Sequence, residues 1–199
     1  MKIYKVNEIF YSVQAEGRNA GKPAIFVRFA GCNLECKFCD TNHEPYVEMT
    51  KDEIERSVAS YAHIHRKSSD LPIIVFTGGE PTMQLSSEEE LCKGYYRAME
   101  TNGILPPPCW INWVTISPKT KLTREQLKWA NELKVLCGHF PEDYVVELGE
   151  LLKRDGMPCY MQPMANKEGE FDVAPSIHFC QRYPFWKLSL QWHKLVNIR

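Results

Sequence analysis

Strand-like apolar runs alternate with helical patterns along this chain, and this alternation limits the folds that the chain can adopt. The expected strands cover 24–31 (AIFVRFAG), 72–77 (PIIVFT), 113–117 (WVTIS), 133–137 (LKVLC), 158–163 (PCYMQP) and 186–191 (WKLSLQ). Repeated strand and helix predicts parallel strands that are joined by right-handed crossovers.

The helical segments carry start and stop signals of their own. Thr50 with Glu53, and Thr123 with Gln126, each match the capping-box pattern. The segment 141–156 begins with proline and ends with glycine, which is the asymmetry expected of a helix. These signals predict helices over about 51–65, 86–99, 141–156 and 173–182, with a short helix after Thr123.

Length and composition narrow the architecture further. The chain has 199 residues, about 50 fewer than a typical eight-unit barrel. We therefore expect a compact α/β fold, a partial and open (β/α) barrel. With 44% hydrophobic and 25% charged residues and no linker-like segment, residues 1–199 are expected to form one domain. A net charge of -1 without a basic block argues against nucleic-acid binding.

Four polar motifs follow expected strands, where reacting groups gather in such folds. They are the cysteine loop CNLECKFCDT after the first strand, GGEP after the second, SPK after WVTI and QPM after PCYM. We therefore expect these motifs to converge on one rim of the barrel.

The cysteine loop points to a metal site with an open coordination position. Cys32, Cys36 and Cys39 stand at spacings x3 and x2 with no obvious fourth cysteine, so a [4Fe-4S] cluster would keep one iron free. A structural Cys3His zinc site that uses His43 is the alternative. The other five cysteines are interpreted as packing residues. The start of the chain has no signal-peptide pattern and no apolar run is long enough to span a membrane, so we expect a soluble, cytoplasmic protein.

Together the motifs resemble a known enzyme family. The three-cysteine loop with Phe38, followed by GGEP, resembles the radical S-adenosylmethionine (SAM) enzymes. More closely, EIFYSVQAEG, FVRFAGCN, CDT, TGGEP, ETNG, TISPK, MQP and SLQWHK resemble, in family order and over essentially the whole chain, the 7-carboxy-7-deazaguanine synthases. A structural zinc site would not require GGEP or SPK elsewhere in the chain.

The resemblance implies the cofactors and their contacts. Cys32, Cys36 and Cys39 would hold a [4Fe-4S] cluster whose fourth iron binds SAM, the source of a 5′-deoxyadenosyl radical. The positions that match the SAM contacts of the family are Phe38, Cys39, Asp40, Gly78, Gly79, Glu80, Ser117, Pro118, Lys119 and Gln162. Taken singly, a Gly-Gly pair is more often a tight turn and a lysine is more often solvated.

The resemblance also implies a substrate, 6-carboxy-5,6,7,8-tetrahydropterin, which would lose ammonia to give 7-carboxy-7-deazaguanine on the route to queuosine. Arg28 would bind its carboxylate in bidentate fashion, although a surface ion pair is the plainer interpretation. The matching substrate positions are Gln14, Ala15, Glu16, Arg28, Thr77, His193 and the terminal Arg199. Thr41 matches a ligand of Mg²⁺, or caps a turn.

The chain departs from the family pattern at Ala15, which replaces the usual glycine, and a positive φ at this position would strain alanine. The short chain predicts trimmed peripheral helices and a homodimer that covers the apolar surface left by the trimming. A flavodoxin or a ferredoxin is the expected reductant. Two other interpretations remain: a glycyl-radical activase with the same loop, and an iron-sulfur or zinc-stabilised binding module.

Overall fold

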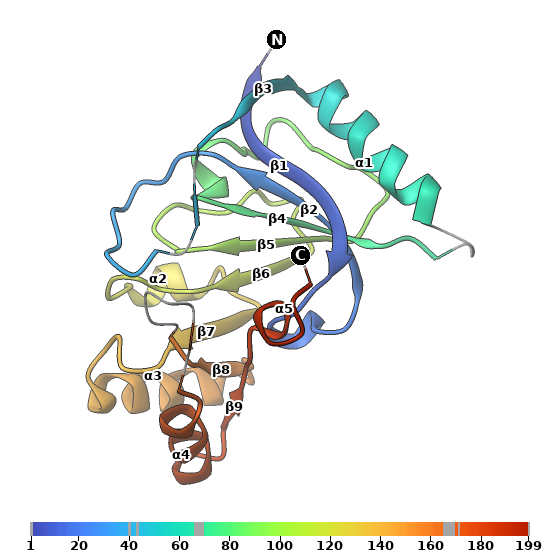
Figure 1. The fold of residues 1–199 in the computed structure, drawn as a ribbon. Coiled ribbons are helices and arrows are strands. Elements are labelled where there is room, and N and C mark those ends of the chain that lie inside the picture. The colour runs from blue at the N-terminus through green and yellow to red at the C-terminus, as the bar shows by residue number, and fades with distance from the viewer. Residues whose placement is uncertain are drawn as a thin grey trace.

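A single twisted sheet of nine strands forms the frame of the molecule (Figure 1). The computed structural model describes residues 2–39, 41–42, 44–65, 70–164, 170 and 172–198. The strand order is β3-β1-β2-β4-β5-β6-β7-β8-β9. β2 and the six strands from β4 to β9 run parallel, whereas β1 pairs in antiparallel fashion with both β2 and β3. The sheet curves without closing, which confirms the partial, open barrel.

The strands have the following bounds: β1 Ile3–Val13, β2 Pro23–Phe29, β3 Val47–Thr50, β4 Ile73–Gly78, β5 Arg97–Thr101, β6 Trp113–Ile116, β7 Glu132–Leu136, β8 Cys159–Gln162 and β9 Trp186–Leu188. The α-helices are α1 Lys51–His65, α2 Arg124–Leu127, α3 Glu142–Arg154, α4 Ala174–Arg182 and α5 Trp192–Leu195. Two 3-10 helices, η1 Gly17–Asn19 and η2 Pro81–Met83, complete the described elements. None of the described helices is long and apolar enough to span a membrane.

Both predicted capping boxes are present. At the start of α1, Glu53 accepts hydrogen bonds from the backbone and side chain of Thr50, and the Glu53 N–H donates back to the Thr50 hydroxyl. Thr123 and Gln126 make the same reciprocal contacts at α2. Pro141 is the N-cap of α3, one position before the first turn where we expected it, and Gly156 follows the helix with φ +68°.

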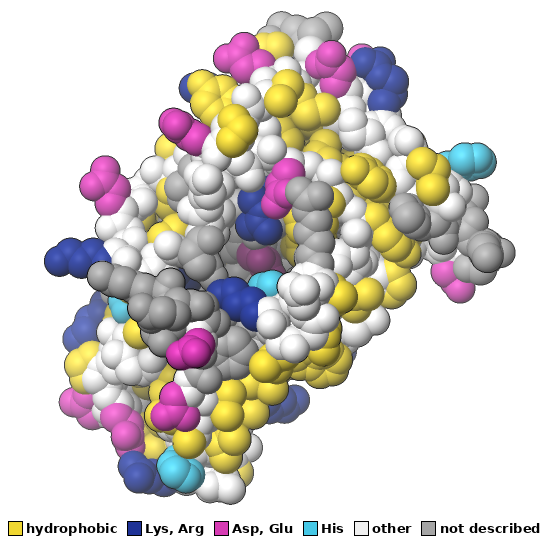
Figure 2. Space-filling view, in the orientation of Figure 1, with side chains coloured by type: hydrophobic (Ala, Val, Ile, Leu, Met, Phe, Trp, Pro, Cys, Tyr) yellow, Lys and Arg dark blue, Asp and Glu magenta, His cyan; other side chains and the backbone are white. Residues whose placement is uncertain are grey.

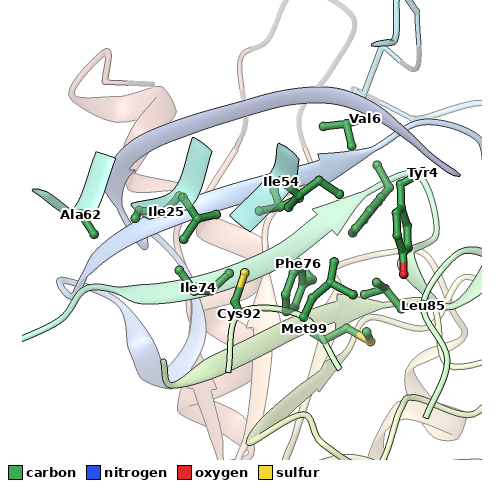
Figure 3. Packing of buried hydrophobic residues seen from close by; sticks show 14 residues of the cluster. Tyr4, Val6, Ile25, Ile54, Ala62, Ile74, Phe76, Leu85, Cys92 and Met99 are labelled. Atoms are coloured by element: carbon green, nitrogen blue, oxygen red, sulfur yellow. The ribbon is translucent and has the colours of Figure 1, made fainter. Parts of the chain in front are cut away.

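The core beneath α1 joins the helix to the first parallel strands (Figure 3). Ile54 and Ala62 on the buried face of α1 pack against Ile25 of β2 and Ile74 of β4. A second cluster lies between α3, α4 and the strands from β6 to β9, and in it Trp186 of β9 packs edge-on against Phe179 of α4. These two cores hold the parallel strands in register, so the ends of the strands form a stable rim.

The predicted helix over 86–99 is wrong. Residues 86–96 form turns, and Arg97–Thr101 is strand β5, which pairs with β4 and β6. Gly94 and Cys92 both have positive φ, which no helix accommodates, and Met99 is buried in the sheet. Tertiary pairing here overrides the local helical propensity of the glutamate-rich segment.

Strands β1 and β3 were not predicted from the sequence. The trimming of peripheral helices stays a prediction. Residues 79–112, all of which the structure describes, contain no α-helix between β4 and β6. One face of this part of the sheet is therefore covered by turns, including the 3-10 helix η2.

Candidate active site

A cavity of about 1110 Å³ opens at the carboxyl ends of the parallel strands. Figure 2 shows the hollow in the middle of this face, with basic, acidic and histidine side chains inside it. Residues at or near the ends of five of the parallel strands, β2, β4, β5, β6 and β8, line the cavity: Arg28, Thr77, Glu100, Ser117 and Gln162. The expected convergence of the polar motifs on one rim therefore occurs.

Most of the predicted site residues line this cavity. Those that do are Gln14, Ala15, Glu16, Arg28, Phe38, Cys39, Thr41, Thr77, Gly78, Gly79, Ser117, Lys119, Gln162 and His193. Cys32, Cys36, Glu80 and Pro118 are not among the residues that line it. Asp40 and Arg199, and the alternative zinc ligand His43, lie outside the described residues.

The cysteine loop forms one wall of the cavity. The Cys39 N–H donates to the carbonyl of Cys36 at 3.0 Å, and Phe38 and Cys39 face the cavity. Burial raises the pKa of Cys32 and Cys36, and the neighbouring thiols raise it further. The ammonium of Lys119 acts in the opposite direction on Cys36.

The donor chemistry of this loop suits an iron-sulfur cluster with one open iron. The thiols of Cys36 and Cys39 lie close enough to Cys32 to raise its pKa, and the other five cysteines lie outside the loop. In the part of the chain that the structure describes, no three His, Cys, Asp or Glu side chains already stand together as a ready metal site. The side chains of the loop would therefore have to adjust around a cluster.

The Gly-Gly pair is required by the backbone of the cysteine loop itself. A Cβ atom on Gly79 would lie 1.8 Å from the carbonyl oxygen of Gly31, and one on Gly78 would lie 2.2 Å from that of Phe29. The N–H groups of Gly79 and Glu80 donate to these same carbonyls at 2.9 Å. The two glycines line the cavity and also let the end of β4 pack directly against the base of the loop.

Glu80 is a buried anchor. Its side chain is fully buried, and Oε1 accepts hydrogen bonds from the backbone and hydroxyl of Thr82 and from the hydroxyl of Thr101. Oε2 accepts from the backbone N–H of Asn102 at 2.8 Å. The Asn102 side chain in turn donates to Oδ1 of Asn33 at 2.7 Å, so one network joins GGEP, the end of β5 and the cysteine loop.

The loop after β6 and the loop after β7 lie beside the cysteine loop. Lys119 donates from Nζ to the Ser117 hydroxyl at 2.7 Å and to its carbonyl at 3.0 Å. The His139 Nε2 atom lies 2.9 Å from the Lys119 carbonyl, and the ring packs edge-on against Phe38 at 4.8 Å between centroids. These contacts place Lys119 beside the cysteine loop.

A buried ion pair lies on the cavity floor. The Lys134 ammonium contacts the Glu16 carboxylate and lies 3.9 Å from Glu100. Burial by itself would raise the pKa of Glu16, but Lys134 and a 3.0 Å hydrogen bond from Gln191 lower it to about 2. Burial would lower the pKa of Lys134, but the two glutamates raise it. Both side chains therefore stay charged at neutral pH.

Arg28 lies in the cavity wall, as the resemblance implied, and also makes the ion pair that was the plainer interpretation. Its Nε donates to Oε1 of Glu8 at 2.8 Å. Both side chains are about one-quarter exposed and line the cavity. Because the pair uses Nε, the terminal guanidinium nitrogens lie outside this contact, and they are the atoms that bind a carboxylate end-on.

Ala15 is not strained. Among the described residues, only Cys92 and Asn197 are non-glycine residues with positive φ. The left-handed position in this loop is Gly17, at φ +64°, where a Cβ would lie 2.2 Å from Oε1 of Glu132. The departure of the chain from the family pattern therefore leaves the loop conformation intact.

Several residues of the site were not predicted from the sequence. Glu8, Glu100, Asn102, Lys134 and Gln191 all line the cavity. A signal existed for all of them. Lys134 interrupts an apolar strand, where a lysine is seldom buried without a partner. The other four belong to the motifs EIFYSVQAEG, ETNG and SLQWHK: Glu8, Glu100, Asn102 and Gln191. The incorrect helix over 86–99 hid the position of Glu100 at a strand end.

Comparison with known proteins shows what the chain is similar to. Residues 26–180 match the radical SAM superfamily. The chain is 39% identical to the 7-carboxy-7-deazaguanine synthase of Bacteroides thetaiotaomicron, in an alignment that covers 98% of both chains. It is 36% identical to the 7-carboxy-7-deazaguanine synthase of Burkholderia multivorans, in an alignment that covers 98% of this chain and 99% of its relative. The crystal structure of QueE from Escherichia coli superposes with a TM-score of 0.70 at 25% identity and covers 95% of this chain and 94% of that one.

Proposed function

The chain belongs to the 7-carboxy-7-deazaguanine synthases of the radical SAM superfamily, and from this membership we propose the reaction that its cavity performs. The substrate is 6-carboxy-5,6,7,8-tetrahydropterin, and the products are 7-carboxy-7-deazaguanine and ammonia. The reaction contracts the ring and is redox-neutral, since the two products together contain the atoms of the substrate. The enzyme is thus a radical SAM lyase that serves queuosine biosynthesis.

One observation carries the proposal. The wall with the three-cysteine loop, the guanidinium of Arg28 and the charged floor of Glu16, Glu100 and Lys134 all border the same cavity. A carboxylated, nitrogen-rich ring needs a cation at one end and hydrogen-bond acceptors at the other. This cavity offers both within reach of the cysteine loop.

The cofactor side of the cavity is assigned to the motif residues. Cys32, Cys36 and Cys39 would hold a [4Fe-4S] cluster as thiolates, and bound SAM would supply the 5′-deoxyadenosyl radical that removes a hydrogen atom from the substrate. The backbone at Gly78 and Gly79 can approach a ligand closely because no side chain intervenes. Ser117, Lys119 and Gln162 line the cavity and would present polar groups to SAM. Phe38, also in the lining, would form an apolar wall against its adenine.

The substrate side is assigned to the opposite wall. Arg28 binds the substrate carboxylate, and Gln14, Glu16 and Thr77 face the pyrimidine edge of the pterin. His193 on α5 borders the same region and interacts electrostatically with Glu16. The short C-terminal helix therefore covers the substrate end of the cavity.

Thr41 is proposed as a protein ligand of Mg²⁺. It lines the cavity just after the cysteine loop, and a hydroxyl is a hard oxygen donor that suits this ion. Mg²⁺ retains several waters and would share its shell with the substrate carboxylate. The ion would then help Arg28 to neutralise that group.

We further propose a cytoplasmic homodimer that receives electrons from a flavodoxin or ferredoxin. The eight cysteines are free thiols, as expected in a reducing compartment. Trp192, Leu195, Val196 and Ile198 near the C-terminus are large exposed apolar residues, which supports burial against a second subunit. A monomeric mass by light scattering at micromolar concentration would contradict the dimer.

The deciding experiment is an anaerobic assay of the reconstituted protein with SAM, a strong reductant, Mg²⁺ and 6-carboxytetrahydropterin, read by mass spectrometry. We expect 7-carboxy-7-deazaguanine to form without matching net loss of SAM. If 5′-deoxyadenosine accumulates and no deazaguanine forms, the radical chemistry stands and the pterin substrate is wrong.

A further inference from the structure

Lys134 is a lysine on the floor of the cavity with almost no access to solvent. It lies within β7, and only 6% of its side chain is exposed. A buried ammonium without partners is costly, so lysines at such positions are paired. Here the partners are two carboxylates, Glu16 from the loop after β1 and Glu100 from β5, which are far from Lys134 and from each other in the sequence.

The other hydrogen bonds of the two carboxylates hold them at fixed positions. Glu16 Oε1 accepts a hydrogen bond from Nε2 of Gln191 at 3.0 Å. Glu100 accepts from Nε2 of Gln14 at 3.1 Å through Oε1, and from the Thr77 hydroxyl at 2.9 Å through Oε2. An ionised carboxylate offers about four lone-pair positions. Both groups line the cavity and retain acceptor capacity for a ligand.

On the basis of the function proposed above, we propose that Lys134 is the residue that positions the substrate acceptors. Its ammonium holds the carboxylates of Glu16 and Glu100 in place, so that their remaining lone pairs accept hydrogen bonds from the ring N–H and amino groups of the pterin. Lys134 itself need not touch the substrate. It determines specificity through the two carboxylates, which favour a ring edge that presents donors.

The charges around Lys134 and Glu16 explain why the loss of one lysine would change the substrate acceptors. Glu132 on the same strand and His193 on α5 also interact electrostatically with the pair. Without Lys134, the buried Glu16 would face other carboxylates and its pKa would rise, because burial disfavours its ionised form. A protonated Glu16 would then present a hydrogen to the donor edge of the pterin.

The test compares Lys134→Met, which removes the charge, with Lys134→Arg, which keeps it. Lys128→Met is the matched control, since Lys128 pairs with Glu125 on the exposed surface of α2. Binding of 6-carboxytetrahydropterin to the SAM-loaded protein is measured by anaerobic calorimetry at about pH 6 and about pH 8. A carboxyl group whose pKa has been raised by burial is more protonated at the lower of these two pH values. Iron content, SAM affinity and the KM and kcat for the pterin are measured alongside.

We expect Lys134→Met to weaken pterin binding about tenfold or more, the usual effect of losing hydrogen bonds to a charged group. The loss is larger at the lower pH and appears in KM more than in kcat, whereas iron content and SAM affinity are unchanged. Lys134→Arg and Lys128→Met retain the weak pH dependence of the wild type. A purely structural role for Lys134 would lower iron content, SAM affinity and pterin affinity together, without this pH dependence.

A second variant keeps the test decisive if Lys134→Met does not fold. Lys134→Met combined with Glu16→Gln removes both buried charges and leaves a neutral pair. We expect this protein to fold and to bind the pterin more weakly than the wild type, with the pH dependence reduced. Wild-type affinity in either variant would overturn the role of Lys134. If the wild type itself does not bind the pterin, the proposed substrate is wrong and this inference is wrong with it.

Discussion

The carbonyl oxygen of Gly31 lies where a side chain on Gly79 would begin, 1.8 Å from the position of a Cβ atom. Gly79 therefore couples the end of β4 to the base of the cysteine loop through direct backbone packing. The Gly-Gly pair has a structural reason that is independent of any ligand. An experiment can separate this structural reason from a close approach of the backbone to SAM.

Gly79→Ala should destabilise the apo-protein by about 2 kcal/mol or more, because the obstacle is backbone that cannot rotate away. Gly21→Ala is the control, since nothing lies within 4 Å of a Cβ there and only its φ of +88° opposes substitution. Urea unfolding without cluster or SAM measures the difference. Equal stability of Gly79→Ala and wild type would leave close approach to SAM as the only reason for this glycine.

Glu80→Gln should cost about 1–3 kcal/mol of unfolding free energy, since an amide replaces one of two acceptor oxygens that are both in use. Glu88→Gln, on the exposed surface, should be neutral. Thermal unfolding checks both variants. If Glu80→Gln keeps the stability of the wild type and loses SAM affinity, Glu80 contacts the cofactor and is not the buried anchor described above.

The Glu16–Lys134 pair should make stability depend on pH in the acid range. The folded-state pKa of Glu16, about 2, lies below its ordinary 4.5, so its contribution is complete above 4.5 and is lost as the pH falls toward 2. Urea unfolding across this window should show a shallower slope for Glu16→Gln than for the wild type. Glu125→Gln, from an exposed pair, should retain the wild-type slope. Identical slopes for all three proteins would contradict the charged pair.

Arg28→Lys should raise the KM for 6-carboxytetrahydropterin about tenfold or more, because a lysine keeps the charge but loses the forked donor geometry. The discriminating ligand is tetrahydropterin without the carboxyl group, whose affinity should be the same for both proteins. If both ligands bind the variant equally weakly, Arg28 supports the cavity wall through Glu8 and does not bind the carboxylate.

Replacement of any one of the cysteines Cys32, Cys36 and Cys39 by serine should abolish the iron-sulfur absorbance after anaerobic reconstitution, since a cluster with one open iron needs all three thiolates. Cys109→Ser is the control, because Cys109 is exposed and lies outside the loop. Iron and zinc contents are measured together. Stoichiometric zinc that persists in the wild type under these conditions would favour the zinc-stabilised module.

Local signals in the sequence predicted much of the fold and the rim on which the polar motifs lie. The capping boxes at Thr50 and Thr123 and the Gly156 stop depend on neighbours within one or two turns of chain, so the sequence contains the whole interaction. Strand alternation placed GGEP, SPK and QPM at strand ends, and parallel pairing then required them to share one rim.

The tertiary structure decided what depends on distant partners. Lys134 and Glu16 are 118 positions apart, and no local pattern states that a lysine in an apolar strand meets a glutamate from a loop near the other end of the chain. The end of the segment predicted as a helix, from Arg97 on, is strand β5 because β4 and β6 offer hydrogen-bonding edges on both sides of it. The sequence by itself determined the family and its motifs; the packed sheet determined which side chains are buried together, because burial and charge pairing arise only when remote segments meet.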